Sequence, residues 1–279
     1  MNAILREKLL RFLEEDLFLG DALKIPDKTI EAEIVSKDEG IVAGIKVLKI
    51  LFDIVNVEVV ENIEDGSKIK PGDVVMVLRG NAKDILAVER TALNILMRMS
   101  GIATAVAKMI EKARKVNPHV IIAGTRKTTP GFRLFEKMAI EIGGGDPHRY
   151  SLGDCVLVKH NHITLSGLEK AVEIAKKSSF TKKVEVEVKT VEEAIKVAEM
   201  GVDVIMFDNM SPEEIGRAVK ELEVRGLRNK VLLEASGGIN LDNVEDYART
   251  GVDVISSGFV THSSRWLDFN LRIRYILRK

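Results

Sequence analysis

Basic side chains gather between Gly124 and His162, in a stretch that is broken by glycine and proline. Its cations are Arg126, Lys127, Arg133, Lys137, Arg149 and Lys159, and its histidines are His148, His160 and His162. The whole chain is neutral, with 42 basic and 42 acidic side chains, so this excess of positive charge is local. A local cluster of cations in a neutral protein favours a small anionic ligand over a nucleic acid.

The segment GGGDPHR at 143–149 admits two interpretations. It could be a flexible linker. Alternatively, its glycines let the backbone approach a ligand closely while His148 and Arg149 project into a site. The guanidinium fork of Arg149 suits a carboxylate or phosphate because it can donate two parallel hydrogen bonds.

Acidic side chains stand in the apolar runs that follow. In VEVEVK at 184–189 alternate side chains share a face, so the valines would pack on helices and Glu187 would face the interior with Glu185. Asp208 ends a later apolar run. Buried carboxylates need a cation or a metal ion beside them, unless 184–189 is an exposed edge strand with a charged face.

Glycine and serine follow the last two apolar runs, as Ser236-Gly237-Gly238 and Ser257-Gly258. In barrels of parallel strands, loops at these places often bind phosphate through backbone N–H groups. A glycine pair also serves any tight turn, so only the two loops together indicate a phosphate site.

The elements that would position these residues alternate between strand and helix from residue 117 onward. Apolar strands are expected at 120–125, 154–159, 184–189, 202–208, 231–235 and 252–257, and the clearest helices at 163–177, 191–200, 211–223 and 241–249. Such alternation predicts parallel βαβ units. Polar residues then come at the carboxyl ends of six strands, where sites form in parallel barrels. A barrel of the TIM type, short of eight strands, fits this pattern, and an open doubly wound sheet is the alternative.

The first 116 residues have a different pattern. A helix is expected at 3–18, strands at 29–36, 57–62 and 74–78, a helix at 41–55, and a long helix at 84–116 that could break near Ser100-Gly101. Short strands separated by turns indicate an α+β unit with an antiparallel sheet.

Composition restricts the cellular setting. No apolar run approaches the roughly 18 to 20 residues of a membrane span, and the single cysteine, Cys155, predicts a cytoplasmic protein without disulfides. The absence of glutamine together with many charged residues is typical of a thermophile.

Seven blocks in order along the chain carry a family resemblance. They include ERTALNILMRMSGIAT, GTRKTTPG, VEVEVKT, MFDNM and EASGGI. Together they resemble the quinolinate phosphoribosyltransferase family. The resemblance implies an incomplete six-stranded TIM-like α/β barrel over 117–265, preceded by an α+β sandwich-like domain over 1–116. It also implies a C-terminal helix over 266–279 that packs back towards the first domain.

The resemblance further implies an activity and its site. Quinolinate would react with phosphoribosyl pyrophosphate, with Mg²⁺ as cofactor, in a homodimer or an assembly of dimers that binds neither nucleic acid nor membrane. Arg90 would be donated to the partner's site. Substrate would be held by Thr125, Arg126, Lys127, His148, Arg149 and Lys159, with Lys127, Lys159, Glu187 and Asp208 in catalysis. Glu187 and Asp208 would hold the metal, and Ser236, Gly237, Gly238, Ser257 and Gly258 the phosphate.

Three other functions fit parts of the pattern. Lys159 at a strand end could form a Schiff base in an aldolase-like lyase. A related phosphoribosyltransferase could act on nicotinate or another aromatic acid. A non-catalytic metabolite-binding protein would not need the acidic pair Glu187 and Asp208.

Overall fold

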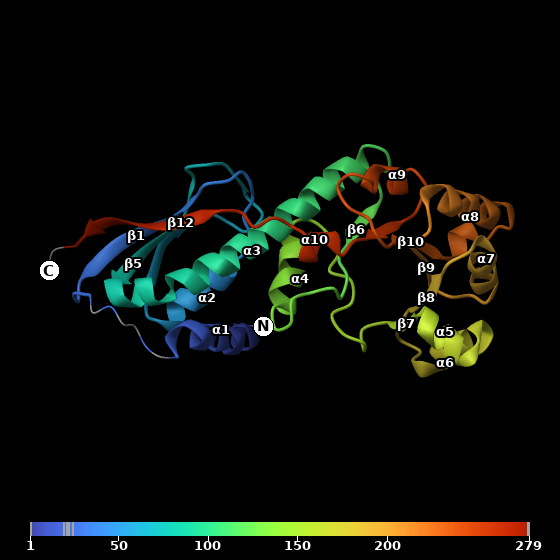
Figure 1. The fold of residues 1–279 in the computed structure, drawn as a ribbon, viewed down its shortest axis with the longest axis horizontal. Coiled ribbons are helices and arrows are strands. Elements are labelled where there is room, and N and C mark those ends of the chain that lie inside the picture. Colours follow the sequence, from blue (N-terminus) through green and yellow to red (C-terminus); the bar gives the residue numbers. More distant parts are fainter. Residues whose placement is uncertain (1, 19, 21–22, 24, 278–279) are drawn as a thin grey trace. The chain divides into compact units, whose positions relative to one another are not determined.

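The computed structural model describes residues 2–18, 20, 23 and 25–277, which fall into two compact units (Figure 1). The first unit comprises the residues up to Ala105 together with those from Arg265 onward, and the second is Val106–Ser264. The boundary lies within the long helix α3 (Ala82–Arg114), whereas the sequence analysis places it at residue 116, the end of the helix predicted there.

The first unit is built on an antiparallel sheet of strand order β12-β1-β5-β3. Its strands are β1 (Thr29–Ser36), β3 (Glu58–Asn62), β5 (Val74–Asn81) and β12 (Phe269–Ile276), with a separate pair of β2 (Gly40–Ile41) and β4 (Lys68–Ile69). Its helices are α1 (Asn2–Leu17), α2 (Ile45–Ile54) and the first part of α3. The α+β interpretation is confirmed. The helix predicted from residue 41 begins at Ile45, because Gly40 and Ile41 pair in β2.

The predicted C-terminal helix over 266–279 is wrong for the residues that the structure describes. Phe269–Ile276 form β12, which pairs antiparallel with β1, and residues 278–279 lie outside the described chain. The segment FNLRIRYI alternates apolar and polar side chains with period two, a strand pattern. Arg272 and Arg274 both pair with the buried carboxylate of Glu33 on β1, which supports this register.

Helix α3 runs without the break predicted near Ser100-Gly101. Gly101 serves close packing instead, since a Cβ at this position would lie 2.2 Å from the carbonyl oxygen of Arg265. Among the described residues, α3 is the helix whose length and composition would let it cross a membrane. However, 72% of its most apolar window is buried within the protein, as is common for a core helix.

The second unit contains six parallel strands in the order β6-β11-β10-β9-β8-β7. The strands are β6 (Ile121–Ala123), β7 (Val156–Val158), β8 (Val184–Val188), β9 (Val204–Asp208), β10 (Leu232–Ser236) and β11 (Val254–Ser256). From β7 to β11 each strand neighbours the next one along the chain, and β11 returns to β6. A doubly wound sheet would instead reverse its strand order in the middle. The order is that of a barrel that stays open between β6 and β7.

Helices connect the barrel strands. They are α4 (Arg133–Ile142), α5 (His160–Ser166), α6 (Leu168–Ser178), α7 (Val191–Glu199), α8 (Pro212–Val224), α9 (Val244–Ala248) and α10 (Phe259–His262), with a 3₁₀ turn at Arg228–Lys230. Two helices replace the one predicted at 163–177, because Gly167 between them has φ +78°. Helix α8 begins as expected, with a reciprocal pair of hydrogen bonds between Ser211 and Glu214.

The glycine-rich segment before β7 lies along the free edge of β6. Asp146 forms a parallel bridge with Ala123, its N–H donates to the carbonyl of Ile122 at 2.9 Å, and its own carbonyl accepts the Gly124 N–H at 2.9 Å. The linker interpretation of 143–149 is therefore wrong, because backbone pairing fixes this segment inside the barrel opening.

Candidate active site

A cavity of about 640 Å³ opens at the carboxyl ends of the barrel strands. All the site residues predicted from the sequence line it, except Arg90: these are Thr125, Arg126, Lys127, His148, Arg149, Lys159, Glu187, Asp208, Ser236, Gly237, Gly238, Ser257 and Gly258. Parallel strands meet at one edge, so residues that are far apart in the chain converge there.

The loop after β6 supplies the first cations, and its backbone is tied down. The Lys127 N–H donates to Thr125 Oγ1 at 3.0 Å, and the Thr261 hydroxyl donates to the Lys127 carbonyl at 2.7 Å. Arg126 Nε is buried and has no hydrogen-bond partner in the described chain. A buried donor without a partner is costly unless a ligand completes it, which suits an anion here.

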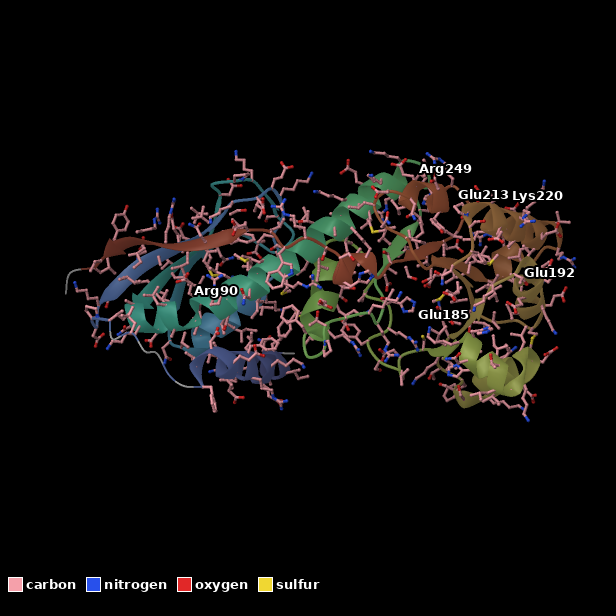
Figure 2. All side chains as sticks on the ribbon, viewed as in Figure 1. Arg90, Glu185, Glu192, Glu213, Lys220 and Arg249 are labelled. Carbon is pink, nitrogen blue, oxygen red and sulfur yellow. The ribbon has the colours of Figure 1, made fainter. Side chains whose placement is uncertain are left out.

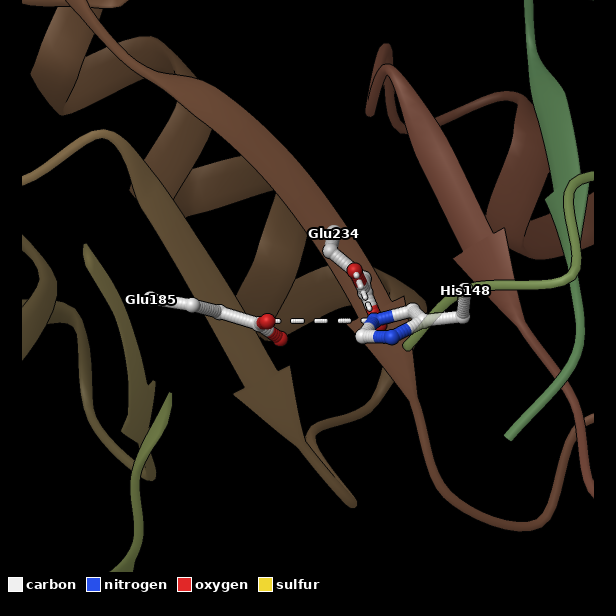
Figure 3. Close-up of side chains that lie close together, drawn as sticks. All are labelled: His148, Glu185 and Glu234. Atoms are coloured by element: carbon white, nitrogen blue, oxygen red, sulfur yellow. Dashed lines mark ion pairs between the residues drawn. The ribbon is translucent and has the colours of Figure 1, made fainter. Parts of the chain in front are cut away.

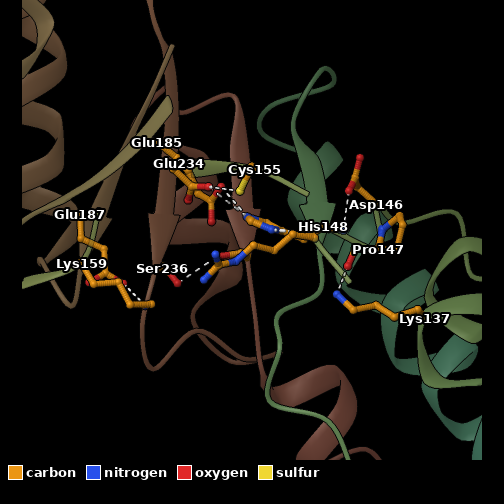
Figure 4. Close-up of polar contacts among 12 residues, drawn as sticks. Lys137, Asp146, Pro147, His148, Cys155, Lys159, Glu185, Glu187, Glu234 and Ser236 are labelled. Atoms are coloured by element: carbon orange, nitrogen blue, oxygen red, sulfur yellow. Dashed lines mark hydrogen bonds and ion pairs between the residues drawn. The ribbon is translucent and has the colours of Figure 1, made fainter. Parts of the chain in front are cut away.

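Helix α4, which was not predicted from the sequence, holds two cavity loops through the neighbouring buried side chains of Glu136 and Lys137 (Figure 4 shows Lys137 at Pro147). Glu136 accepts hydrogen bonds from the Thr129 N–H at 3.1 Å and the Thr129 hydroxyl at 3.0 Å. Lys137 donates to the carbonyl of Pro147, directly before His148. Burial, together with the charge of nearby Arg133, lowers the pKa of Lys137 to about 8. One turn of α4 thus fixes the loops that precede and follow this helix.

Lys159 and Glu187 form an ion pair in the cavity, from the ends of neighbouring strands. The Lys159 side chain is 48% exposed, while that of Glu187 is 9% exposed. The second carboxylate oxygen of Glu187 accepts the His160 N–H at 3.3 Å. The prediction that 184–189 turns its acidic side chains inward is confirmed, and the exposed-edge alternative is wrong. The Glu187 carboxylate is held in one orientation by the Lys159 ammonium group and the His160 backbone amide.

Asp208 ends β9 beside a residue that the sequence reading missed. The side-chain amide of Asn209 donates to Asp208 Oδ1 at 2.9 Å, and the Asn209 N–H donates to the Ser236 carbonyl at 2.8 Å. Asn209 has φ +55°, a conformation that asparagine tolerates better than most residues. The Asp-Asn pair after an apolar run was a usable signal. Other lining residues that went unpredicted include Asn240, Phe259 and His262.

The two Ser-Gly loops form a cradle of backbone and hydroxyl groups. Ser256 Oγ donates to Ser236 Oγ at 2.9 Å, and Ser257 Oγ donates to the Ile239 carbonyl at 2.6 Å. Glycine is required on steric grounds at Gly237, where φ is +101° and a Cβ would lie 2.3 Å from Asn209 Oδ1. At Gly258 a Cβ would lie 2.8 Å from Lys127 Cδ. Both loops therefore present a bare backbone to the cavity.

Gly237→Ala should lower the free energy of unfolding by more than Gly226→Ala. Both positions have positive φ, which costs alanine roughly 1–2 kcal/mol. Gly226 has open space around it, whereas the Gly237 Cβ meets Asn209 and adds about 1–3 kcal/mol of overpacking. Denaturant unfolding of the two variants measures the difference. Equal losses would show that the Asn209 contact is not the constraint.

Arg90 lies outside this cavity. It is an exposed residue of α3 in the first unit and is not among the lining residues (Figure 2). The structure of the single chain therefore assigns Arg90 no role in the cavity.

An open α/β barrel whose strand ends carry both cations and fixed carboxylates defines a barrel enzyme for anionic substrates. The model of the quinolinate phosphoribosyl transferase C-terminal domain matches residues 102–272, and that of the N-terminal domain matches residues 18–100. The chain belongs to the quinolinate phosphoribosyl transferase family.

Known proteins are similar to this chain over most of its length. The probable nicotinate-nucleotide pyrophosphorylase [carboxylating] of Archaeoglobus fulgidus is 60% identical, over 91% of this chain and 98% of that protein. The human nicotinate-nucleotide pyrophosphorylase [carboxylating] is 42% identical, over 87% of this chain and 82% of that protein. The structure of the Francisella tularensis nicotinate-nucleotide pyrophosphorylase has a TM-score of 0.91 at 34% identity, covering 98% of this chain and 97% of the other.

Proposed function

We propose that this protein transfers a phosphoribosyl group from phosphoribosyl pyrophosphate to quinolinate, giving nicotinate mononucleotide, pyrophosphate and CO₂ in NAD biosynthesis. Beyond membership of the family, the composition of the cavity is the observation that supports this function most directly. The cavity joins the cations of two strand ends and the glycine-rich segment with the carboxylates of Glu187 and Asp208. Two strongly anionic substrates need the cations, and a developing positive charge on ribose needs the carboxylates.

The cations bind and orient the substrates. Arg149 comes from the fixed segment beside β6, and Arg126 and Lys127 come from the loop that follows β6. His148, predicted to bind substrate, instead turns Nε2 towards Glu234 and Glu185 and accepts the Arg149 N–H at Nδ1. Between them the three cations can hold two carboxylates of one aromatic ring together with the phosphate groups of the other substrate. The Ser-Gly loops supply N–H and hydroxyl donors for the 5′-phosphate. Held in this way, the pyridine nitrogen and the ribose carbon meet in one orientation.

The role of Glu187 in this reaction is electrostatic. When the bond to pyrophosphate breaks, the ribosyl ring becomes positive, and a carboxylate already fixed by Lys159 and the His160 amide stabilises that charge without reorganising. The bond between the pyridine nitrogen and the ribose carbon then forms. The quaternised nitrogen next to the leaving carboxylate accepts electron density as CO₂ departs. No side chain is required as a covalent nucleophile.

Asp208 fits Mg²⁺ better than Glu187 does. Among the described residues, both oxygens of Glu187 already have partners, whereas for Asp208 one oxygen accepts from Asn209. One protein carboxylate with the remaining positions on substrate oxygens and water is a usual arrangement for Mg²⁺. Asp208 would ligate the ion and Glu187 would contact it through water. When bound, Mg²⁺ neutralises charge on the departing pyrophosphate.

The direct test is release of labelled CO₂ from quinolinate that carries the label in its 2-carboxyl group. Release should require both phosphoribosyl pyrophosphate and Mg²⁺, and should stop when the metal is chelated. Nicotinate is the control acceptor, because it has one carboxylate and cannot lose CO₂ in this reaction. Nucleotide formation from nicotinate without turnover of quinolinate would overturn the substrate assignment.

We infer that Arg90 acts in the site of a second subunit of a homodimer. Arg90→Ala and Lys159→Ala should each be inactive alone. Their equimolar mixture should recover about a quarter of wild-type activity, because half of the randomly assorted dimers hold one intact site. Mass spectrometry of the intact assembly confirms that hybrids form. Hybrids without activity would place Arg90 in its own subunit's site or outside any site.

The cellular setting is also a proposal. We place the enzyme in the cytoplasm of a thermophile, because the chain has a single cysteine and no glutamine.

A further inference from the structure

Three side chains from three separate segments of the barrel unit meet beside the cavity, which one of them, His148, also lines. His148 comes from the segment in the barrel opening, Glu185 from β8 and Glu234 from β10 (Figure 3). His148 Nε2 lies 3.4 Å from a Glu234 oxygen and 3.7 Å from a Glu185 oxygen. The side chains of both glutamates are at most 5% exposed. Two carboxylates therefore converge on one ring nitrogen across the interior.

The other side of the ring is also held. The Arg149 N–H donates to His148 Nδ1 at 2.8 Å, and the His148 N–H donates to Asp146 Oδ1 at 2.6 Å. His148 has φ +52°, a conformation that costs a non-glycine residue energy and persists only where surrounding contacts enforce it. The imidazole thus links two barrel strands to the backbone of Arg149.

Two influences act on the number of protons that the ring carries. Burial opposes a charged ring, but the glutamates outweigh it and raise the pKa of His148 to about 10. The Arg149 N–H acts the other way, since it favours an Nδ1 without a proton and hence a neutral ring. In both forms Nε2 carries a proton and faces the carboxylates. The link from the glutamates to the ring does not depend on which form dominates.

Glu185 and Glu234 have few partners that offset the free-energy cost of burying their carboxyl groups. Burial raises the pKa of Glu234, and Glu185 stands next to it. One oxygen of each has no hydrogen-bond partner in the described chain. Cys155 is a further neighbour, with its sulfur 3.7 Å from Glu185; burial raises the pKa of this thiol to about 11. Burying two acidic side chains is costly, so a function other than core packing is expected for them.

We propose that Glu185 and Glu234 are positioning residues that act through His148 to set the place of Arg149 in the cavity. The segment that carries Arg149 is not a barrel strand, and its backbone is held by the edge of β6, by the end of α4 and by the Lys137 side chain. The glutamates tie it to β8 and β10 on the opposite wall. This proposal rests on the proposed function, in which Arg149 binds quinolinate. Glu185 and Glu234 do not line the cavity and would not touch the substrate.

Glu185→Met and Glu234→Met test the proposal, because methionine has a similar size but accepts no comparable hydrogen bond. Each should raise KM for quinolinate by about tenfold or more, equivalent to about 1.4 kcal/mol, with KM for phosphoribosyl pyrophosphate nearly unchanged. The Gln variants keep an acceptor for the Nε2 proton and should recover most of the loss. Glu33→Met, at a buried ion-paired glutamate of the first unit, is the control for loss of stability alone.

Two further measurements show whether the glutamates act through the ring. Nitrogen-15 NMR of the histidine side chains should show a proton on Nε2 of His148 that exchanges faster in the Met variants. His148→Asn should abolish the effect of Glu234→Met, so that the double variant resembles His148→Asn alone. Independent, multiplying effects would overturn the proposal, as would equal rises in both KM values.

Two outcomes separate this proposal from others. Zinc bound in stoichiometric amount to purified wild type and lost in Glu234→Gln would overturn it in favour of a metal site, since the three ligand atoms lie within 4.8 Å of one another. If the wild type releases no CO₂ from quinolinate, the proposed function fails. The NMR signature and the calorimetric affinity for quinolinate still test the positioning role.

Discussion

Lys159→Met should lower kcat/KM for quinolinate on the order of 10³-fold. Two effects combine. The cavity loses a cation at a strand end, and Glu187 becomes a carboxylate without its cation that faces anionic substrates. Removing one partner of a desolvated charge pair costs about 2–5 kcal/mol, much of it from the group left behind. Lys159→Arg should keep the charge but misplace it, and lie between wild type and Lys159→Met.

Lys196 offers a matched control. It also pairs with a glutamate, Glu169, and its side chain is 49% exposed, close to the 48% of Lys159. However, Glu169 is 63% exposed, and the pair lies outside the cavity. Lys196→Met should therefore leave kcat/KM within about twofold of wild type, since exposed pairs contribute little. Comparable losses in both variants would show that the Lys159 effect is general destabilisation.

Glu187→Gln should lower kcat by about 10²–10³-fold while changing KM for either substrate much less. Glutamine keeps the shape and can still accept the His160 N–H, but it lacks the charge that stabilises a positive ribosyl ring. Loss of one preorganised electrostatic contact typically has an effect of this size. Steady-state kinetics for both substrates, with single-turnover measurement of the chemical step, checks the prediction.

Glu33→Gln is the corresponding control for a buried, ion-paired glutamate elsewhere. Glu33 is as buried as Glu187 and pairs with Arg272 and Arg274 in the first unit. Glu33→Gln should lower the free energy of unfolding but leave kcat unchanged, when kcat is measured at a temperature where the variant is folded. If instead Glu187→Gln raised KM with kcat intact, Glu187 would serve binding alone.

The positions of the cavity residues could be predicted because a parallel barrel maps chain order onto space. Once strands and helices alternate, the residue after each strand must lie at one edge, which was enough to group Lys159, Asp208 and the Ser-Gly loops. Their individual roles remain predictions. Period two in VEVEVK likewise fixed the inward face of Glu187.

Two of the parts that were missed depend on packing between separate elements. The Lys137 contact with Pro147 exists only because α4 packs under the loop, and nothing local to either residue specifies it. Glu234 was a visible signal, an acidic residue inside the apolar run VLLEAS, but its partner His148 lies across the barrel. β12 was misread although its alternation was present in the sequence; five of its eight residues are exposed at the edge of the sheet.

The pairing of β6 with β11 also has a consequence for synthesis of the chain. The strand partner of Ile121–Ala123 is Val254–Ser256, which leaves the ribosome about 130 residues later. At roughly 5–20 residues per second, the edge of β6 that pairs with β11 stays unpaired for roughly 7 to 27 seconds. The bridge to Asp146 lies only about 23 residues downstream and becomes available within seconds. The segment that later presents Arg149 thus covers the other edge of β6 before any substrate site exists, so only the edge for β11 stays open to pairing with another nascent chain.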